Sequence, residues 1–187
     1  MNDLNLWQKK FSGIPPLGYL LRENFGSRWI RFHSLPESKR YAENDQEMSI
    51  ILNRATILAN EVLGTDQCSL FVSYPDYNNE QASNSKKAAK NIYNLDQSFS
   101  WQQADEDEAL HWTTYWASTH WNTDAFSPLI KKIADDNEYP VVWLSNASLE
   151  VFAPYDGGFD IICKTPERIS QLQEKYADWM SSRADRL

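Results

Sequence analysis

Three short apolar segments separated by turn signals constrain the fold of this chain most strongly. The segments cover residues 139–144, 149–155 and 159–164, and the sequences S-N-A-S and D-G-G separate them. Apolar runs of this length are typical of buried strands, and connections this short join antiparallel neighbours. The last third of the chain therefore predicts three strands connected as hairpins.

Further strand patterns occur earlier in the chain, again in pairs rather than in strict alternation with helices. The segment H-W-T-T-Y-W-A-S-T-H-W is rich in threonine and aromatic residues, which suit a pleated surface better than a helix. Paired strands predict the α+β class, with a mostly antiparallel sheet of about six to seven strands and helices packed mainly on one face. The four further predicted strands are residues 29–33, 69–74, 98–102 and 109–118.

The helical segments show apolar spacings of three and four residues. The clearest one runs from Asp45 to Leu63, and Gly64 is a typical residue for its C-terminal cap. Shorter helices are expected within residues 4–25, where a Pro-Pro pair interrupts the pattern, and over residues 125–136. The last predicted helix follows Thr165, a preferred capping residue, with proline at its first position.

Length and composition predict one globular domain over residues 1–187. Of its residues 42% are hydrophobic and 24% are charged, and the longest apolar runs are far shorter than the roughly 20 residues of a membrane span. The N-terminus lacks the apolar core of a secretory signal, so we expect a cytoplasmic protein without membrane contact. Cys68 and Cys163 lie in strand-like apolar runs, which predicts buried free thiols.

The net charge of −8 is unevenly distributed along the chain. Residues 101–138 carry two basic and eight acidic side chains, whereas residues 1–41 carry seven basic and three acidic ones. An acidic surface repels phosphate backbones and attracts basic proteins, because summed charge steers association. We therefore expect a basic protein partner and no direct binding of nucleic acid.

The acidic region also carries many aromatic residues, and the combination predicts a partner-binding surface. Strand alternation places Trp112 and Trp116 on one face of the strand and Tyr115 and Trp121 on the other. Trp112 and Trp116 are either exposed for partner binding or part of the core. Tyr115 and Trp121 are expected to be exposed. Aromatic anchors and charges together favour protein binding, although a solvated turn also explains the four adjacent carboxylates. The predicted partner-binding residues are Asp105, Glu106, Asp107, Glu108, Tyr115, Trp121 and Asp124.

A basic cluster in R-F-H-S-L-P-E-S-K-R-Y is the alternative candidate site. Arg31 and His33 share one face of a predicted strand, and with Lys39 and Arg40 they would clamp a small anion, His33 exchanging a proton. The other interpretation is an ordinary charged surface turn, since no glycine-rich phosphate loop accompanies the cluster.

Catalytic and metal-binding signatures are missing from the sequence. It contains no G-x-S-x-G, H-E-x-x-H, C-x-x-C or Walker sequence, and His111 and His120 are too widely separated for a one-turn zinc pair. The carboxylates Asp156 and Asp160 lie in Y-D-G-G-F-D, where a hairpin explains both glycines without chemistry. We therefore expect no enzyme activity, no cofactor and no metal site.

Three blocks of the sequence carry a family resemblance. They are R-F-H-S-L-P-E-S-K-R-Y, the helix I-L-N-R-A-T-I-L-A-N-E-V-L-G with its following strand, and V-F-A-P-Y-D-G-G-F-D-I-I-C with L-Q-E-K-Y-A-D-W. Together they resemble an uncharacterised, mainly bacterial family, the domain of unknown function numbered thirty-eight eighty-five, over roughly three quarters of the chain. That family usually shows Asp-Asp-Arg-Gly where this chain has Tyr155-Asp156-Gly157-Gly158, so the arginine of the turn is missing here.

The resemblance implies a kind of protein rather than an activity. Small acidic bacterial proteins of this kind are often encoded beside secreted toxins as cognate immunity proteins. The combined expectation is an immunity protein, of the contact-dependent-inhibition type, that binds a basic toxin domain such as a nuclease and occludes its active site. A small-anion-binding protein or enzyme built on Arg31, His33, Lys39 and Arg40 is the alternative.

Overall fold

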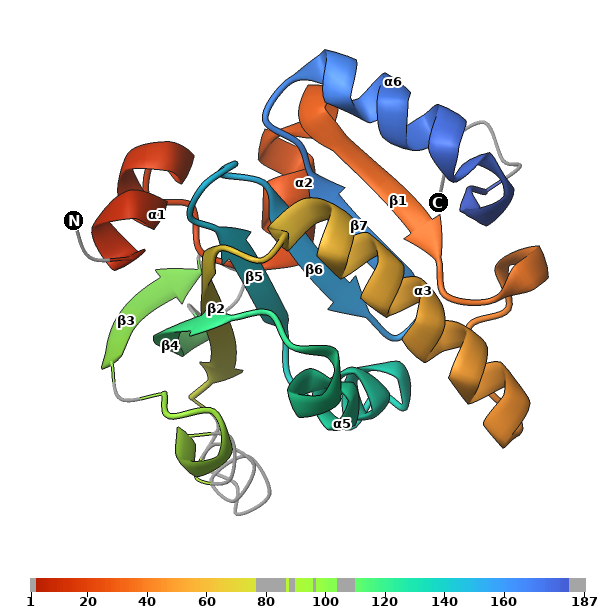
Figure 1. The fold of residues 1–187 in the computed structure, drawn as a ribbon. Helices are drawn as coiled ribbons and strands as arrows, with labels where there is room; N and C mark the ends of the chain where they lie inside the picture. The colour runs from red at the N-terminus through yellow and green to blue at the C-terminus, as the bar shows by residue number, and fades with distance from the viewer. Residues whose placement is uncertain (1–2, 77–86, 88–89, 96, 104–109, 182–187) are drawn as a thin grey trace.

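One antiparallel sheet forms the centre of the protein (Figure 1). The computed structural model describes residues 3–76, 87, 90–95, 97–103 and 110–181. Within them the sheet has seven strands in the order β1-β7-β6-β5-β2-β4-β3, and all neighbouring strands are antiparallel, which confirms the predicted class. The strands are β1 (Trp29–His33), β2 (Gln67–Pro75), β3 (Gln97–Gln103), β4 (Leu110–His120), β5 (Val141–Ser145), β6 (Val151–Tyr155) and β7 (Gly158–Ile162).

Helices cover both faces of the sheet, the longer ones on one side. Helices α3 (Asp45–Leu63), α5 (Thr123–Ala134) and α6 (Pro166–Lys175) cover the core that contains Leu70 and Val72 of β2. Helices α1 (Asp3–Phe11) and α2 (Gly18–Asn24) cover the second core, to which Phe71 belongs. Short 3-10 helices occupy Gly26–Arg28 (η1), Pro36–Ser38 (η2) and Ala177–Trp179 (η3).

The helix boundaries follow from capping residues in the sequence. The side chain of Asn44 accepts a hydrogen bond from the backbone N–H of Glu47 at 3.0 Å, and Gly64 ends α3 with a φ of 64°. Asn122 caps α5 in the same way, and Thr165 caps α6 ahead of Pro166. These local signals place both ends of α3 and the start of α6 where the sequence predicts them.

The β6–β7 hairpin needs glycine because other chain segments approach it closely. A β-carbon at Gly158 would lie 2.2 Å from the carbonyl oxygen of Phe32, and one at Gly157 would lie 2.9 Å from the ring of Tyr155. Neither glycine has a positive φ. The predicted hairpin is confirmed, and the glycines are required by β1 and Tyr155 rather than by the turn conformation.

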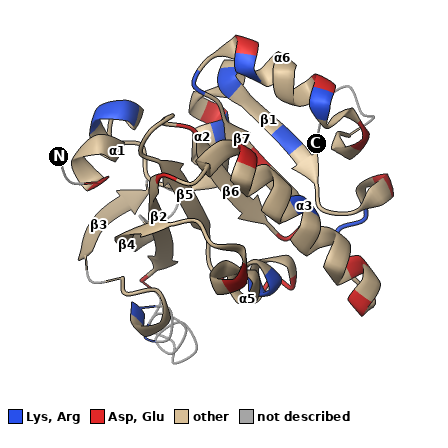
Figure 2. Cartoon of the chain, viewed as in Figure 1, with Lys and Arg blue, Asp and Glu red and all other residues tan. Residues whose placement is uncertain are grey.

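Charge and polarity are distributed as expected for a sheet covered on both sides. Charged residues are concentrated on the helices and loops, while the strands are mostly uncharged (Figure 2).

Cys68 and Cys163 are buried free thiols, as predicted, and burial raises the pKa of each to about 12. Among the described residues, no helix is both long and apolar enough to span a membrane.

Candidate functional site

A hollow of about 280 Å³ opens at the end of the sheet where β5 begins and β6 ends. Its walls come from the start of α2, the segment between α5 and β5, and the β6–β7 turn. We call it the tyrosine hollow, after Tyr19, Tyr139 and Tyr155 in its lining. The charged residues that line it are Arg31, Asp136, Glu138, Asp156 and Asp160.

Pro154 explains why the sheet opens at this point. Strands β5 and β6 pair only at Trp143 with Phe152 and at Leu144 with Val151, whereas β6 stays paired with β7 along its whole length. The two residues that flank a two-residue turn exchange hydrogen bonds with each other. Along β6, every second residue counted from the turn therefore bonds to β7, and the residues between them bond toward β5. Pro154 is one of the latter, so its backbone nitrogen faces β5. Proline has no N–H to donate there, and the two strands separate.

A buried ion pair between β1 and β7 forms part of the lining of the tyrosine hollow. Nε of Arg31 donates to Oδ1 of Asp160 at 2.8 Å, and Nη2 donates to Oδ2 at 2.9 Å. Burial alone would lower the pKa of Arg31, but the hydrogen bonds to Asp160 outweigh it and the pKa lies above its ordinary value. The guanidinium carbon also lies 4.4 Å from the ring centroid of Tyr155, a cation–π contact.

Asp156, which also lines the tyrosine hollow, joins the first and last blocks of the family resemblance. Oδ2 of the buried Asp156 accepts hydrogen bonds from Nε of Arg40 at 2.6 Å and from the hydroxyl of Tyr41 at 2.7 Å. Burial alone would raise the pKa of Asp156, but these donors hold it below its ordinary value. Asp156 is therefore ionised and already neutralised by a cation of the same chain.

The remaining wall carries two carboxylates that form no salt bridge among the described residues. Oε1 of Glu138 accepts from the backbone N–H of Tyr139 at 3.0 Å and from the hydroxyl of Tyr74 at 3.3 Å, and burial raises the pKa of Glu138. Asp136 is exposed in a left-handed conformation, with a φ of 55°. In the part of the chain that the structure describes, neither residue forms a salt bridge. The tyrosine hollow is thus chemically suited to a cationic group.

The basic residues of the predicted anion site do not converge on a common point. Arg31 pairs with Asp160 and Arg40 with Asp156, while Nζ of Lys39 lies 2.7 Å from Oε1 of Glu47. Each of these cations therefore already has a carboxylate partner within the fold.

His33 lies apart from this arrangement and lines a second hollow of about 390 Å³ with Leu35 and Trp179. Its ring is buried, and Nε2 has no hydrogen-bond partner within the described residues. Burial lowers the pKa of His33, and the charges of Arg31 and Arg54 lower it further, so the ring is neutral near neutral pH.

Two of the predicted partner-binding residues are accessible, and four lie outside the described residues. Asp105, Glu106, Asp107 and Glu108 belong to the latter group. Asp124 is exposed in the first turn of α5, and Tyr115 is half-buried, with the ammonium of Lys90 at 4.8 Å from its ring centroid.

The predicted exposure of Trp121 is wrong. Its ring is buried in the core under α5, with ring centroids 5.5 Å from Phe126 and from Trp143. Strand alternation correctly separates it from Trp112 and Trp116, but helices cover that face of the sheet too, so both faces are buried. Trp112 and Trp116 are themselves buried, which confirms the core interpretation for them.

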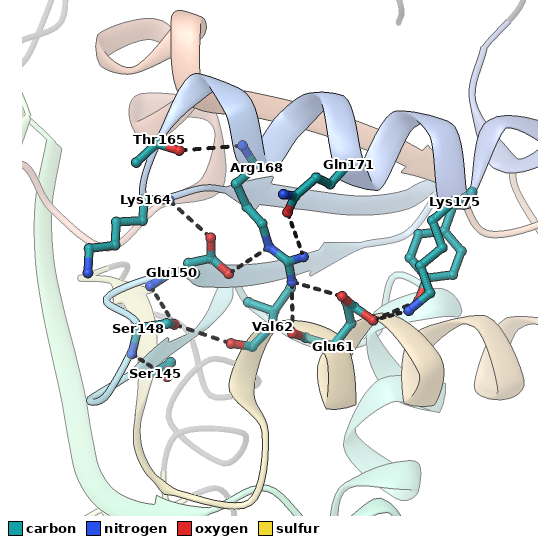
Figure 3. A network of polar contacts seen from close by, with 11 residues as sticks. Glu61, Val62, Ser145, Ser148, Glu150, Lys164, Thr165, Arg168, Gln171 and Lys175 are labelled. Carbon is teal, nitrogen blue, oxygen red and sulfur yellow. Dashed lines mark hydrogen bonds and ion pairs between the residues drawn. The ribbon is translucent and has the colours of Figure 1, made fainter.

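A second polar network, centred on Arg168, ties α3, α6 and the β5–β6 connection together (Figure 3). The guanidinium of Arg168 lies 2.9 Å from Oε1 of Glu61 and 3.5 Å from Oε2 of the buried Glu150. Oε1 of Glu150 accepts from the backbone N–H of Lys164, and Lys175 donates to Oε2 of Glu61. The charged groups of Arg168, Glu61, Glu150 and Lys175 all have partners of opposite charge, so we assign this network to stability.

Metal binding finds no support in the geometry. Within residues 3–76, 87, 90–95, 97–103 and 110–181, no group of three or more His, Cys, Asp or Glu side chains is arranged to hold a metal ion.

Fold and site together define an α+β protein with an acidic, tyrosine-lined hollow at one end of its sheet. The chain belongs to the family described as domain of unknown function DUF3885, whose model matches residues 17–184. No curated protein and no solved structure matches the chain.

Sequence reasoning did not single out Asp136, Glu138 and Tyr139 as site residues. They follow a helix and precede a strand, so they resemble an ordinary connection. One signal was available, because Pro154 interrupts a segment that otherwise reads as a central strand, and proline there marks an opening in the ladder.

Proposed function

We propose that this chain is a binding protein of the immunity type, which captures a basic protein domain and blocks it without catalysing a reaction. One observation carries the proposal: the tyrosine hollow combines tyrosine rings with two carboxylates, Asp136 and Glu138, that form no salt bridge among the described residues. Tyrosine anchors contribute much of the energy at protein interfaces, and unpaired charge sets the encounter rate.

The surroundings of the tyrosine hollow support a protein rather than a small anion as the ligand. Tyr41 is exposed and hydrogen-bonded to Asp156 of the lining, so a further aromatic side chain lies beside that residue. The hydroxyl of Tyr19 donates to Oε1 of Gln103 at 2.8 Å, and Gln103 is followed in the sequence by the acidic residues 105–108. A toxin nuclease is the partner class that fits best, because carboxylates can take the place of phosphates in its basic cleft.

The test is capture of the partner by the tagged full-length chain from its native host at low salt, followed by titration of the purified pair. The bound protein should be basic, and its affinity should fall as salt rises. Replacing Asp136 and Glu138 with lysine should weaken binding at least tenfold. A second variant, with lysine at Asp105, Glu106, Asp107 and Glu108, measures the contribution of that segment.

The matched control reverses two exposed carboxylates away from the tyrosine hollow, Asp66 before β2 and Glu174 on α6. This control should bind as the unaltered chain does. Unchanged affinity in both site variants would overturn the assignment of the binding surface, and blocking of the partner's activity is the readout for the immunity role.

The alternative function, a small-anion binder or enzyme, has one supporting observation, the unpartnered Nε2 of His33 beside its own hollow. The pairing of Arg31, Lys39 and Arg40 weighs against it. A hydrolytic activity screen with His33→Ala as the control separates the two functions, because turnover lost in that variant would favour the enzyme.

A further inference from the structure

The chemistry of the tyrosine hollow indicates which group of a basic partner it would receive, an inference that rests on the proposed function. The hollow is open before any ligand arrives, because Pro154 keeps β6 apart from β5. Its lining offers three different kinds of contact, and each of them restricts the ligand.

The charges select a cation. Of the four carboxylates in the lining, Asp160 and Asp156 are held by Arg31 and Arg40, and this leaves Asp136 and Glu138. Glu138 is half-buried, and burial opposes its ionised form, so an incoming positive charge would stabilise that form. An anion would instead meet two carboxylates and no free cation among the described residues of the lining.

The aromatic rings select a flat cation. The guanidinium carbon of Arg31 already lies 4.4 Å from the ring centroid of Tyr155, so the fold itself contains one cation–π contact at this site. Tyr19 and Tyr139 line other parts of the wall. A guanidinium stacks on aromatic rings and binds carboxylates in bidentate fashion, whereas the ammonium of lysine is a compact, strongly hydrated charge.

The apolar part of the lining suits the stem of a long side chain. Ile133, Val141, Ala153 and the two prolines Pro140 and Pro154 contribute this surface. Methylene groups of arginine bury readily against such surface while the charged end stays with its polar partners.

The geometry points to one arginine side chain of the partner as the ligand of the tyrosine hollow, its guanidinium held by Asp136 and Glu138 and its stem against the apolar wall. The tyrosine hollow thereby binds one specific side chain and does not act only as a region of negative potential. We call this proposed site the arginine socket.

The test uses the full chain and a small probe, N-acetyl-arginine N-methylamide, in an NMR titration. We expect saturable shifts confined to the amides of residues 19, 136–139, 141, 153, 155 and 156, with a dissociation constant on the order of millimolar. The citrulline derivative has nearly the same shape without the charge and should bind at least tenfold more weakly. The lysine derivative should also bind more weakly than arginine.

Variants locate the binding. The pair Asp136→Asn and Glu138→Gln should weaken arginine binding at least tenfold, whereas Asp66→Asn with Glu174→Gln should leave it unchanged. Urea unfolding curves show whether each variant is folded, and the comparison of arginine with citrulline on the unaltered chain decides the question without any variant.

Equal binding of arginine and citrulline, tighter binding of lysine, or shifts elsewhere would overturn the inference. If the lysine-reversal variant loses the protein partner while the unaltered chain ignores the arginine probe, the proposed function stands and the arginine socket fails. If the probe binds but the reversal leaves partner affinity unchanged, the socket stands and the proposed binding surface fails.

Discussion

Arg31 and Asp160 face each other on β1 and β7, 129 residues apart in the sequence, and the guanidinium meets both oxygens of the carboxylate. Their side chains are only 13% and 5% exposed. This pair fixes the edge strand β1 to the β6–β7 hairpin, and both residues line the tyrosine hollow.

Removing one member of this pair should leave an uncompensated buried charge. Arg31→Met is expected to lower the free energy of unfolding by about 3 kcal/mol, and Arg31→Met with Asp160→Leu should recover much of that loss. Urea unfolding of both single variants and the double variant measures the coupling. Lys39→Met, at the more exposed pair with Glu47, should cost much less than Arg31→Met. Strictly additive losses at Arg31 and Asp160 would contradict the interpretation.

Gly158→Ala should be strongly destabilising because the added methyl group would meet the backbone oxygen of Phe32 at 2.2 Å. Since β1 would have to move, we expect a loss of about 2–3 kcal/mol, measured by thermal unfolding. Gly26→Ala is the matched control, because a β-carbon at Gly26 has no atom within 4 Å. Equal melting temperatures for the two variants would show that the space between Gly158 and the backbone oxygen of Phe32 can accept a methyl group.

The network around Glu61 should make stability depend on pH. Burial alone would raise the pKa of Glu61, but hydrogen bonds from Lys175 and Arg168 outweigh it and lower the pKa below its ordinary 4.5. The stabilisation is therefore complete above the ordinary value and is lost as the pH falls through the folded-state pKa. Glu61→Gln should cost about 1 kcal/mol near pH 7 and much less near pH 3. A difference between the two proteins that does not change with pH would contradict this assignment.

Both thiols should report global unfolding. Cys68 and Cys163 are fully buried, and burial raises the pKa of each to about 12, so almost no reactive thiolate exists in the folded chain at about pH 8. We expect no alkylation of the native protein and complete alkylation of both residues in denaturant, detected by intact mass. Rapid modification of either thiol under native conditions would indicate local opening of the sheet.

The elements with strong local signals could be predicted from the sequence, whereas their arrangement could not. The apolar stripe and caps of α3 and the hairpins of β5, β6 and β7 depend on neighbouring residues, so the sequence predicts them. The pairing of β1 with β7 and the edge position of β3 depend on residues far apart in the chain, for which local patterns carry no information.

The same distinction applies to the site. The tyrosine hollow draws Tyr19, Arg31, Glu138 and Tyr155 from four separate segments, so no sequence motif contains it. Trp121 illustrates the same limit. Strand alternation places it on the correct side of the strand, but local patterns could not reveal that α5 covers that side.

The missing N–H of Pro154 also has a kinetic consequence. Because the opening arises from a covalent property of the chain, we expect it to be present in every molecule and not to close and reopen as a hinged lid does. Binding there requires no prior rearrangement, so the observed association rate should rise linearly with ligand concentration and show no plateau.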